Sequence, residues 1–135
     1  MFLDDIRDFI ATMDITVDEN CYCGRMSEKE DKSIGIYPLK SGRQPNIPIG
    51  GLKNSSYGVK GISILVHWNR SVRDTERVAI ELQSKLINTR NVTINGHNII
   101  FVQTSNDEPI PVGTDDNGVY EYVIECLFYY ERKKE

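Results

Sequence analysis

Two cysteines placed two positions apart are the most chemically suggestive pair in the sequence. Cys21 and Cys23 occupy a short stretch that predicts a strand, and alternate residues of a strand point to the same side. Two such thiolates could share a soft metal ion such as zinc, which takes about four protein ligands in a structural site. The remaining candidates, Cys126, His67 and His97, show no paired spacing. We therefore interpret the cysteines as small apolar side chains on a buried strand, and predict no metal and no cofactor.

A histidine with serines close by in the sequence raises the question of nucleophilic catalysis. His67 follows Ser63 and precedes Ser71. No G-x-S-x-G nucleophile elbow and no local Cys-His signature accompanies them, and a lone histidine on a strand is usually a half-buried structural residue. The protein is predicted not to be an enzyme. A minor alternative is an unrecognised catalytic site centred on His67 or on the turn at 115–116.

Acidic residues cluster in the last third of the chain, where they could attract a divalent cation. Asp107, Glu108, Asp115 and Asp116 lack the alternating spacing and the closing glutamate of a calcium-binding loop. Asp and Asn also favour turns, which explains their presence equally well. The segment 50–53 holds glycine and lysine without Walker spacing, which disfavours nucleotide binding.

The composition is that of a soluble protein with one core. The chain has 135 residues, of which 39% are hydrophobic and 27% are charged, with a formal net charge of -4. This length favours a single domain, and the acidic balance disfavours tight binding to nucleic acid. Acids interrupt the apolar residues at the N-terminus, and no stretch approaches the roughly 20 apolar residues of a membrane span. We expect the protein to be made and kept in a cytoplasm, without a membrane partner, and its three cysteines to be free thiols.

The first half of the chain predicts one helix, short strands and a long loop. Apolar residues recur every three or four positions in residues 1–13, as in an amphipathic helix, and Ser33–Leu39 alternates like a strand. The segment Lys40–Gly58 holds four glycines, two prolines, two asparagines and three serines. It should form an irregular loop, and loops of this length in compact domains are usually functional or disordered. The loop is a candidate arm for contacting a partner.

The second half of the chain predicts a central strand, a second helix, a hairpin and a long final strand. In Val59–Trp68, apolar residues alternate along the sequence and many residues are β-branched, which predicts a central strand. A serine that can cap a helix, followed by a stripe of apolar residues, predicts a helix over Val72–Ile87. Asn95-Gly96 favours a two-residue type I′ hairpin. Val119–Tyr130 alternates over its whole length, and its face of acids and apolar groups should be the wetter one.

This order of elements predicts an α+β fold. We expect a mostly antiparallel sheet of about four to six strands with two helices packed on one face. Residues 1–135 should form a single domain, with the long loop at 40–58 and a short charged tail at 131–135. The other sheet face would need polar side chains or a partner.

The end of the chain resembles that of small minor capsid and tail-terminator proteins of tailed phages. In Pro109–Tyr122, a Gly-x-Asp-x-x-Gly turn at 113–118 leads into a long strand that ends in Tyr129-Tyr130. The block Gly61–Leu86 is similar to the family's central strand and the second helix that follows it. Together with the first helix, the resemblance covers most of the chain in order.

The resemblance implies a structural protein of the virion without catalytic residues. Such a subunit forms a homo-oligomeric ring, typically a hexamer, on the last ring of the tail tube, where it contacts the tube protein and a head-completion protein. The long loop and the acidic turn would then face neighbouring subunits or the lumen. The corresponding contact residues are Arg43, Asn46, Ile47, Ile49, Leu52, Asp115 and Asp116.

Two other assignments stay open at this point. A phage neck or head-completion protein is also a small α+β assembly subunit, and a monomeric module could use the 40–58 loop to hold a peptide or small ligand. In the ring hypothesis, an acidic lumen would let DNA pass without tight or sequence-specific contact, because like charges repel phosphates.

Overall fold

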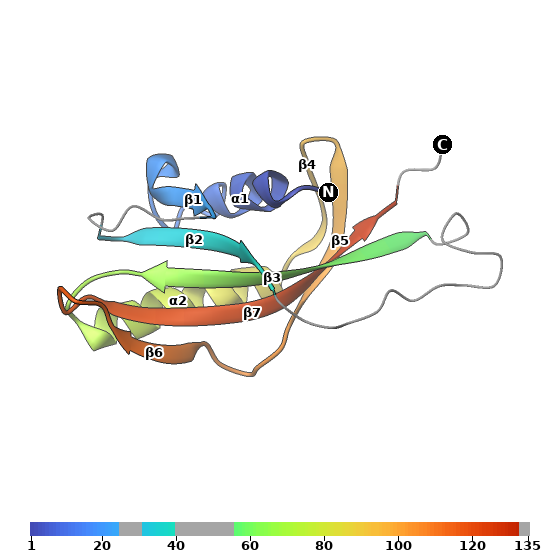
Figure 1. Ribbon diagram of the computed structural model, residues 1–135. Helices are drawn as coiled ribbons and strands as arrows, with labels where there is room; N and C mark the ends of the chain where they lie inside the picture. Colours follow the sequence, from blue (N-terminus) through green and yellow to red (C-terminus); the bar gives the residue numbers. More distant parts are fainter. Residues whose placement is uncertain (25–30, 40–55, 133–135) are drawn as a thin grey trace.

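One curved sheet flanked by two helices makes up the structure, a computed structural model that describes residues 1–24, 31–39 and 56–132 (Figure 1). The elements in chain order are α1 (Leu3–Ala11), a 3₁₀ turn η1 (Asp18–Asn20), β1 (Cys21–Cys23), β2 (Ser33–Pro38), β3 (Tyr57–His67), α2 (Val72–Ile87), β4 (Arg90–Ile94), β5 (His97–Thr104), β6 (Ile110–Thr114) and β7 (Tyr120–Glu131).

The long strand β7 organises the sheet. The strand order is β1-β2-β3-β7-β5-β4, and β6 also pairs with β7. β5 pairs with residues 126–130 of β7, whereas β6 pairs with residues 120–123. The two strands therefore pair with successive parts of β7, on the side away from β3. All pairs are antiparallel except β1 with β2. The α+β class is confirmed, with the difference that the sheet is mixed.

Local sequence signals explain both helices. The Ser71 hydroxyl accepts a hydrogen bond from the Asp74 backbone N–H at 3.3 Å and caps α2, whose bounds match the prediction. At α1 the Asp5 carboxylate accepts from the Phe2 backbone N–H at 2.7 Å. This contact starts the helix at Leu3, two residues later than the apolar pattern alone suggested.

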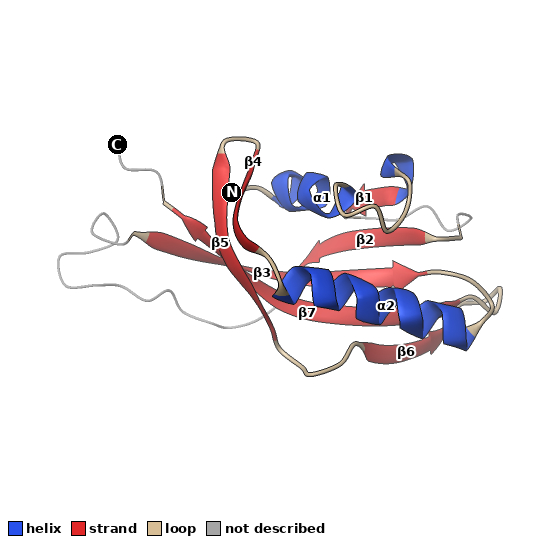
Figure 2. Cartoon of the chain, turned by 180° about the vertical axis from the view of Figure 1, so that it is seen from behind, coloured by secondary structure: helices blue, strands red, loops and turns tan. Residues whose placement is uncertain are grey.

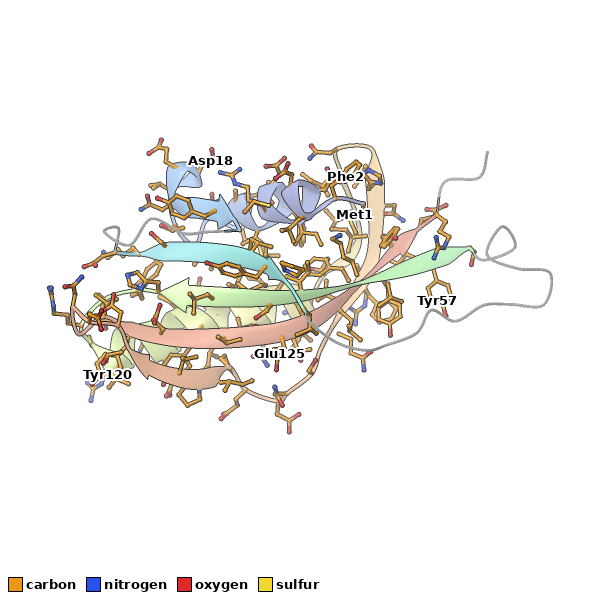
Figure 3. The ribbon with its side chains drawn as sticks, in the orientation of Figure 1. Met1, Phe2, Asp18, Tyr57, Tyr120 and Glu125 are labelled. Carbon is orange, nitrogen blue, oxygen red and sulfur yellow. The ribbon has the colours of Figure 1, made fainter. Side chains whose placement is uncertain are left out.

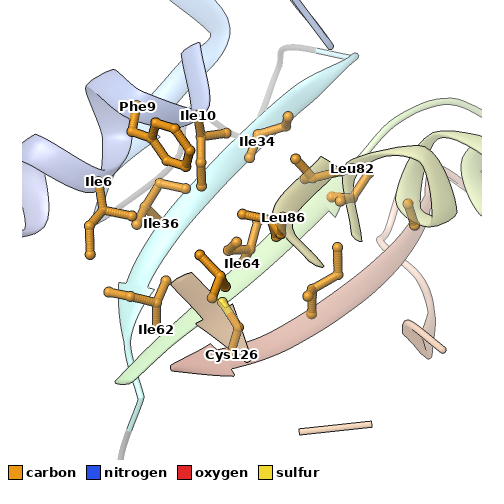
Figure 4. Close-up of a cluster of buried hydrophobic side chains, with 14 of the residues drawn as sticks. Ile6, Phe9, Ile10, Ile34, Ile36, Ile62, Ile64, Leu82, Leu86 and Cys126 are labelled. Carbon is orange, nitrogen blue, oxygen red and sulfur yellow. The ribbon is translucent and has the colours of Figure 1, made fainter. Parts of the chain in front are cut away.

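Both helices pack on the same face of the sheet, as predicted. Alternate residues of the central strands point to this face, because residues two apart share a side. In Figure 4, side chains of the strands meet side chains from α1 and α2. The rings of Phe9 and Phe128 pack edge to face, with their centroids 6.1 Å apart. The hydrophobic core residues with no exposed surface are Ile6, Ile34, Ile36, Ile62, Ile64, Val66, Ala79, Leu82, Leu86, Ile99, Cys126 and Phe128.

The predicted hairpin forms at Asn95-Gly96, where both residues have positive φ. Asn95 and Gly96 have φ of 51° and 80°, which suits a type I′ turn between β4 and β5. The Asn95 side chain also donates to Asp5 at 3.0 Å and to Asp8 at 2.8 Å. The hairpin therefore holds α1 against the sheet.

The start of β3 and the presence of β6 differ from the sequence interpretation. β3 begins at Tyr57, so the end of the predicted 40–58 loop is strand, and residues 40–55 lie outside the described residues. β6 occupies residues 110–114, where no strand was predicted because its proline and glycine suggest irregular backbone. Pro111 is compatible with this strand, since β6 pairs with only one of the described strands.

Candidate functional site

The turn between β6 and β7 is built by the first of its two predicted aspartates. The Asp115 carboxylate accepts hydrogen bonds from the backbone N–H groups of Asn117 and Val119, both at 2.9 Å. Gly118 supplies the positive φ of 79° that the turn needs, and its N–H donates to the Asp115 carbonyl at 3.1 Å. This is the Gly-x-Asp-x-x-Gly segment of the sequence. Asp116 is exposed in the same turn.

His67 ties this turn to the centre of the sheet. Its Nδ1 lies 3.1 Å from a carboxylate oxygen of Glu121, its register partner, and its Nε2 lies 3.7 Å from Asp115 Oδ2. The side chain of His67 is only 7% exposed. Sequence analysis singled out both His67 and Asp115 but did not join them, because contact depends on the pairing of β3 with β7.

The pKa of Asp115 is lowered by these surroundings. The hydrogen bond from Val119 N–H is the main cause; desolvation opposes it, and the Asn117 N–H and the charges of His67 and Arg70 add to the lowering. The two serines near His67 in sequence take no part. Ser71 caps α2, and Ser63 lies four residues along β3, roughly 13 Å away at the usual strand rise. His67 and Asp115 therefore connect β3 to the β6–β7 turn.

The cysteines are free, and they do not share one environment. Cys21 and Cys126 are buried, whereas Cys23 is exposed, which corrects the interpretation of Cys23 as a buried apolar side chain. Desolvation, followed by a hydrogen bond to Asp4, raises the pKa of Cys23 to about 11, and burial raises that of Cys126 to about 12. Protonated thiols are poor nucleophiles and poor metal ligands. Within the described residues, no three His, Cys, Asp or Glu side chains are grouped to hold a metal ion.

Both described helices lie on one side of β3 and β7, and the described residues place no helix on the other side (Figures 1 and 2). Figure 1 shows these strands with α2 behind them, and Figure 2 shows α2 in front. We call this surface the open face. Its residues are partly exposed and combine apolar groups with acids: Ser63, Leu65, Glu121, Val123, Glu125, Leu127 and Tyr129.

The open face is continuous along β7. Leu65 pairs with Val123 and Ser63 with Glu125, and Glu125 lies at the middle of β7 in Figure 3. At the far end, the Tyr129 ring stacks on Phe101 with centroids 4.3 Å apart. The sequence pattern of the final strand predicted this mixed face, and the described residues include no layer above it.

The predicted contact residues fall into two groups. Asp115 and Asp116 lie in the β6–β7 turn, at the end of the open face that carries Glu121. The five loop positions, namely Arg43, Asn46, Ile47, Ile49 and Leu52, lie outside the described residues. Of the predicted contact residues, only the two aspartates therefore have a described position.

Comparison with known proteins addresses the resemblance directly. A family model described as "Bacteriophage tail terminator protein" matches residues 4–132, which include all but the first residue of α1 and every later helix and strand through β7. The chain belongs to this family. No curated protein matches the sequence.

Family membership confirms the resemblance and gives the protein a coarse role. It is a structural protein of the phage tail, from a structural rather than an enzymatic family, and its family works with other tail and head proteins. None of the described helices has the length and apolar character needed to cross a bilayer.

Proposed function

We propose that the protein assembles into a homo-oligomeric ring of six copies that ends the phage tail tube and forms part of the head-tail junction. The observation that carries the proposal is the family match over residues 4–132, because it spans the whole sheet rather than a single motif. The family's description favours the end of the tube over a neck position.

The open face supports self-assembly as the way in which the protein works. Apolar side chains such as Leu65, Val123 and Leu127 are only partly covered, and grouped apolar surface on a soluble protein usually marks an interaction site. Association with another subunit would bury these side chains. The partners that we propose are further copies of the chain, the tail tube protein and the head-completion protein.

The acidic turn contributes to the proposal in a second way. Asp115 and Asp116, together with the net charge of -4, make the protein repel phosphate groups. We place these residues and the 40–58 loop at neighbouring subunits or at the lumen, where DNA would pass without tight contact.

The test is to image the purified protein by negative-stain microscopy, to measure its mass by native mass spectrometry, and to locate it on assembled tails. We expect six-fold rings at one end of tubes of uniform length, and no tight binding of duplex DNA at physiological salt. A protein that is monomeric at high concentration and absent from tube ends would contradict the proposal.

A further inference from the structure

The exposed side of α2 carries an ordered stripe of basic and then apolar residues. Arg73, Arg77, Ile80, Ser84 and Ile87 follow one another at intervals of four and three, so they lie on one side of the helix. We call these five residues the α2 stripe. All of them are exposed, and the two isoleucines are 43% and 42% exposed although they lie on a helix with a full buried face.

A shallow hollow borders the apolar half of the α2 stripe. It is lined by Ile80, Gln83, Ser84, Ile87, Asp107, Glu108 and Pro109, and measures about 230 Å³. Ligand pockets are usually about 300–1,000 Å³, so this hollow suits a side chain of a partner better than a free ligand. The Gln83 amide donates to the carbonyls of Asn106 and Asp107 at 3.2 and 2.8 Å and holds its wall in place.

The charges of α2 are not all used within the chain. Asp74 accepts from the Asn69 side chain and Glu76 from the Tyr122 hydroxyl. Arg73 and Arg77 have no hydrogen-bond or ion-pair partner among the described residues. On the open face, Glu125 likewise has no side-chain partner in the described part of the chain. Unused bases and an unused acid therefore lie on opposite sides of the molecule, next to apolar groups.

We propose that the α2 stripe of one copy docks on the open face of the next copy. This inference rests on the proposed ring and names the surfaces that form it. Along β7 the order is Glu121, Val123 and Glu125, then Leu127 and Tyr129, which matches the order of bases and isoleucines on the helix. The lengths also match, at about 21 Å from Arg73 to Ile87 and about 26 Å along the face.

Charge decides between this contact and a symmetric one. Two α2 stripes placed together would leave the arginines without an opposite charge, and two open faces would leave the glutamates without one. When the α2 stripe of one copy docks on the open face of another, opposite charges are paired and both apolar surfaces are covered. Because the two surfaces lie on opposite sides of the sheet, each copy offers one of each (Figures 1 and 2). Such a head-to-tail contact closes into a ring when the rotation between copies allows it.

The test uses two variants, each of which removes one surface. Ile80→Asp disrupts the α2 stripe, and Leu65→Asp disrupts the open face. Val17→Asp is the matched control, because Val17 is 56% exposed and lies on neither surface. Each variant is checked for folding by circular dichroism and thermal denaturation. Glu125→Arg replaces Leu65→Asp if the latter does not fold.

Native mass spectrometry of each variant alone and of their mixture gives the decisive result. We expect each variant alone to be a monomer, the control to form rings, and the mixture to give a one-to-one heterodimer that grows no further. The heterodimer follows because each partner keeps the surface that the other has lost. Rings that survive both variants, or a mixture that stays monomeric, would overturn this contact and leave the ring standing. A wild-type protein that never assembles would overturn both.

Discussion

The two faces of β7 have the same alternation but opposite surroundings. On one face Tyr122, Ile124, Cys126 and Phe128 are buried under the helices, with exposed fractions of 6%, 2%, 0% and 0%. On the other face Glu121, Val123, Glu125, Leu127 and Tyr129 remain partly exposed. The described residues therefore cover β7 on one side only.

This difference separates the residues that fold the protein from those that we assign to assembly. Burial of apolar surface supplies most of the folding free energy, so the covered face should control stability. The open face leaves apolar surface for a later step, which is the association of subunits. Substitutions on neighbouring residues of one strand should then affect different properties.

The largest expected effect is on the covered face. Phe128→Ala removes a fully buried ring that packs against Phe9, and should lower the free energy of unfolding by about 3–5 kcal/mol. Its neighbour Leu127→Ala should cost less than about 1.5 kcal/mol, because its side chain is only partly buried. Urea denaturation of both variants measures the difference. Equal losses would show that the two faces do not differ in this way.

A smaller effect is expected at the turn that ends the open face. Asp115→Ala removes the acceptor of two backbone N–H groups and the neighbour of His67. The free energy of unfolding should fall by about 1–2 kcal/mol, as for the loss of a capping side chain. Thermal denaturation provides the measurement. Asp116→Ala in the same turn is the control and should melt like the wild type.

Acid should abolish the contribution of Asp115. Its pKa is lower in the folded protein than in the unfolded chain, so the ionised carboxylate stabilises the fold above the unfolded pKa. This stability is lost as the pH falls through the lowered pKa, below about pH 4. The difference in unfolding free energy between wild type and Asp115→Asn should therefore be constant near neutral pH and shrink in acid. A difference that grew in acid would contradict the assigned cause.

Much of the fold could be predicted from the sequence because local signals coincide with tertiary ones. The serine cap and apolar spacing gave both ends of Val72–Ile87, and Asn95-Gly96 gave the hairpin. β6 was missed because Pro111 and Gly113 usually break strands, whereas here they occupy an edge strand with a bulge. The parallel pairing of β1 with β2 was not predicted either, because a short connection normally joins antiparallel strands.

Less of the candidate site could be predicted, because it depends on which elements meet. Asp115 was recognised as a turn residue, but its contact with His67 arises only when β3 and β7 pair. The exposure of Cys23 depends on how α1 lies beside β1. The alternation of β7 did predict a mixed face. The α2 stripe could not be predicted in the same way, because it depends on which side of the helix is buried against the sheet.

The smallest effect on stability should come from a substitution of Glu125. At this residue the effect on stability can be separated from the effect on assembly. Glu125→Gln keeps the size of the side chain, and the residue has no partner among the described residues, so the free energy of unfolding should change by less than about 0.5 kcal/mol. Assembly should nevertheless weaken, because the substitution removes the charge opposite Arg73 and Arg77. The loss should be clear at low salt and should fade near 0.5 M salt, where screening already weakens the wild-type contact. Analytical ultracentrifugation at two salt concentrations measures it, with Glu81→Gln, beside the α2 stripe, as the control. A variant that assembles like the wild type at low salt would remove Glu125 from the contact.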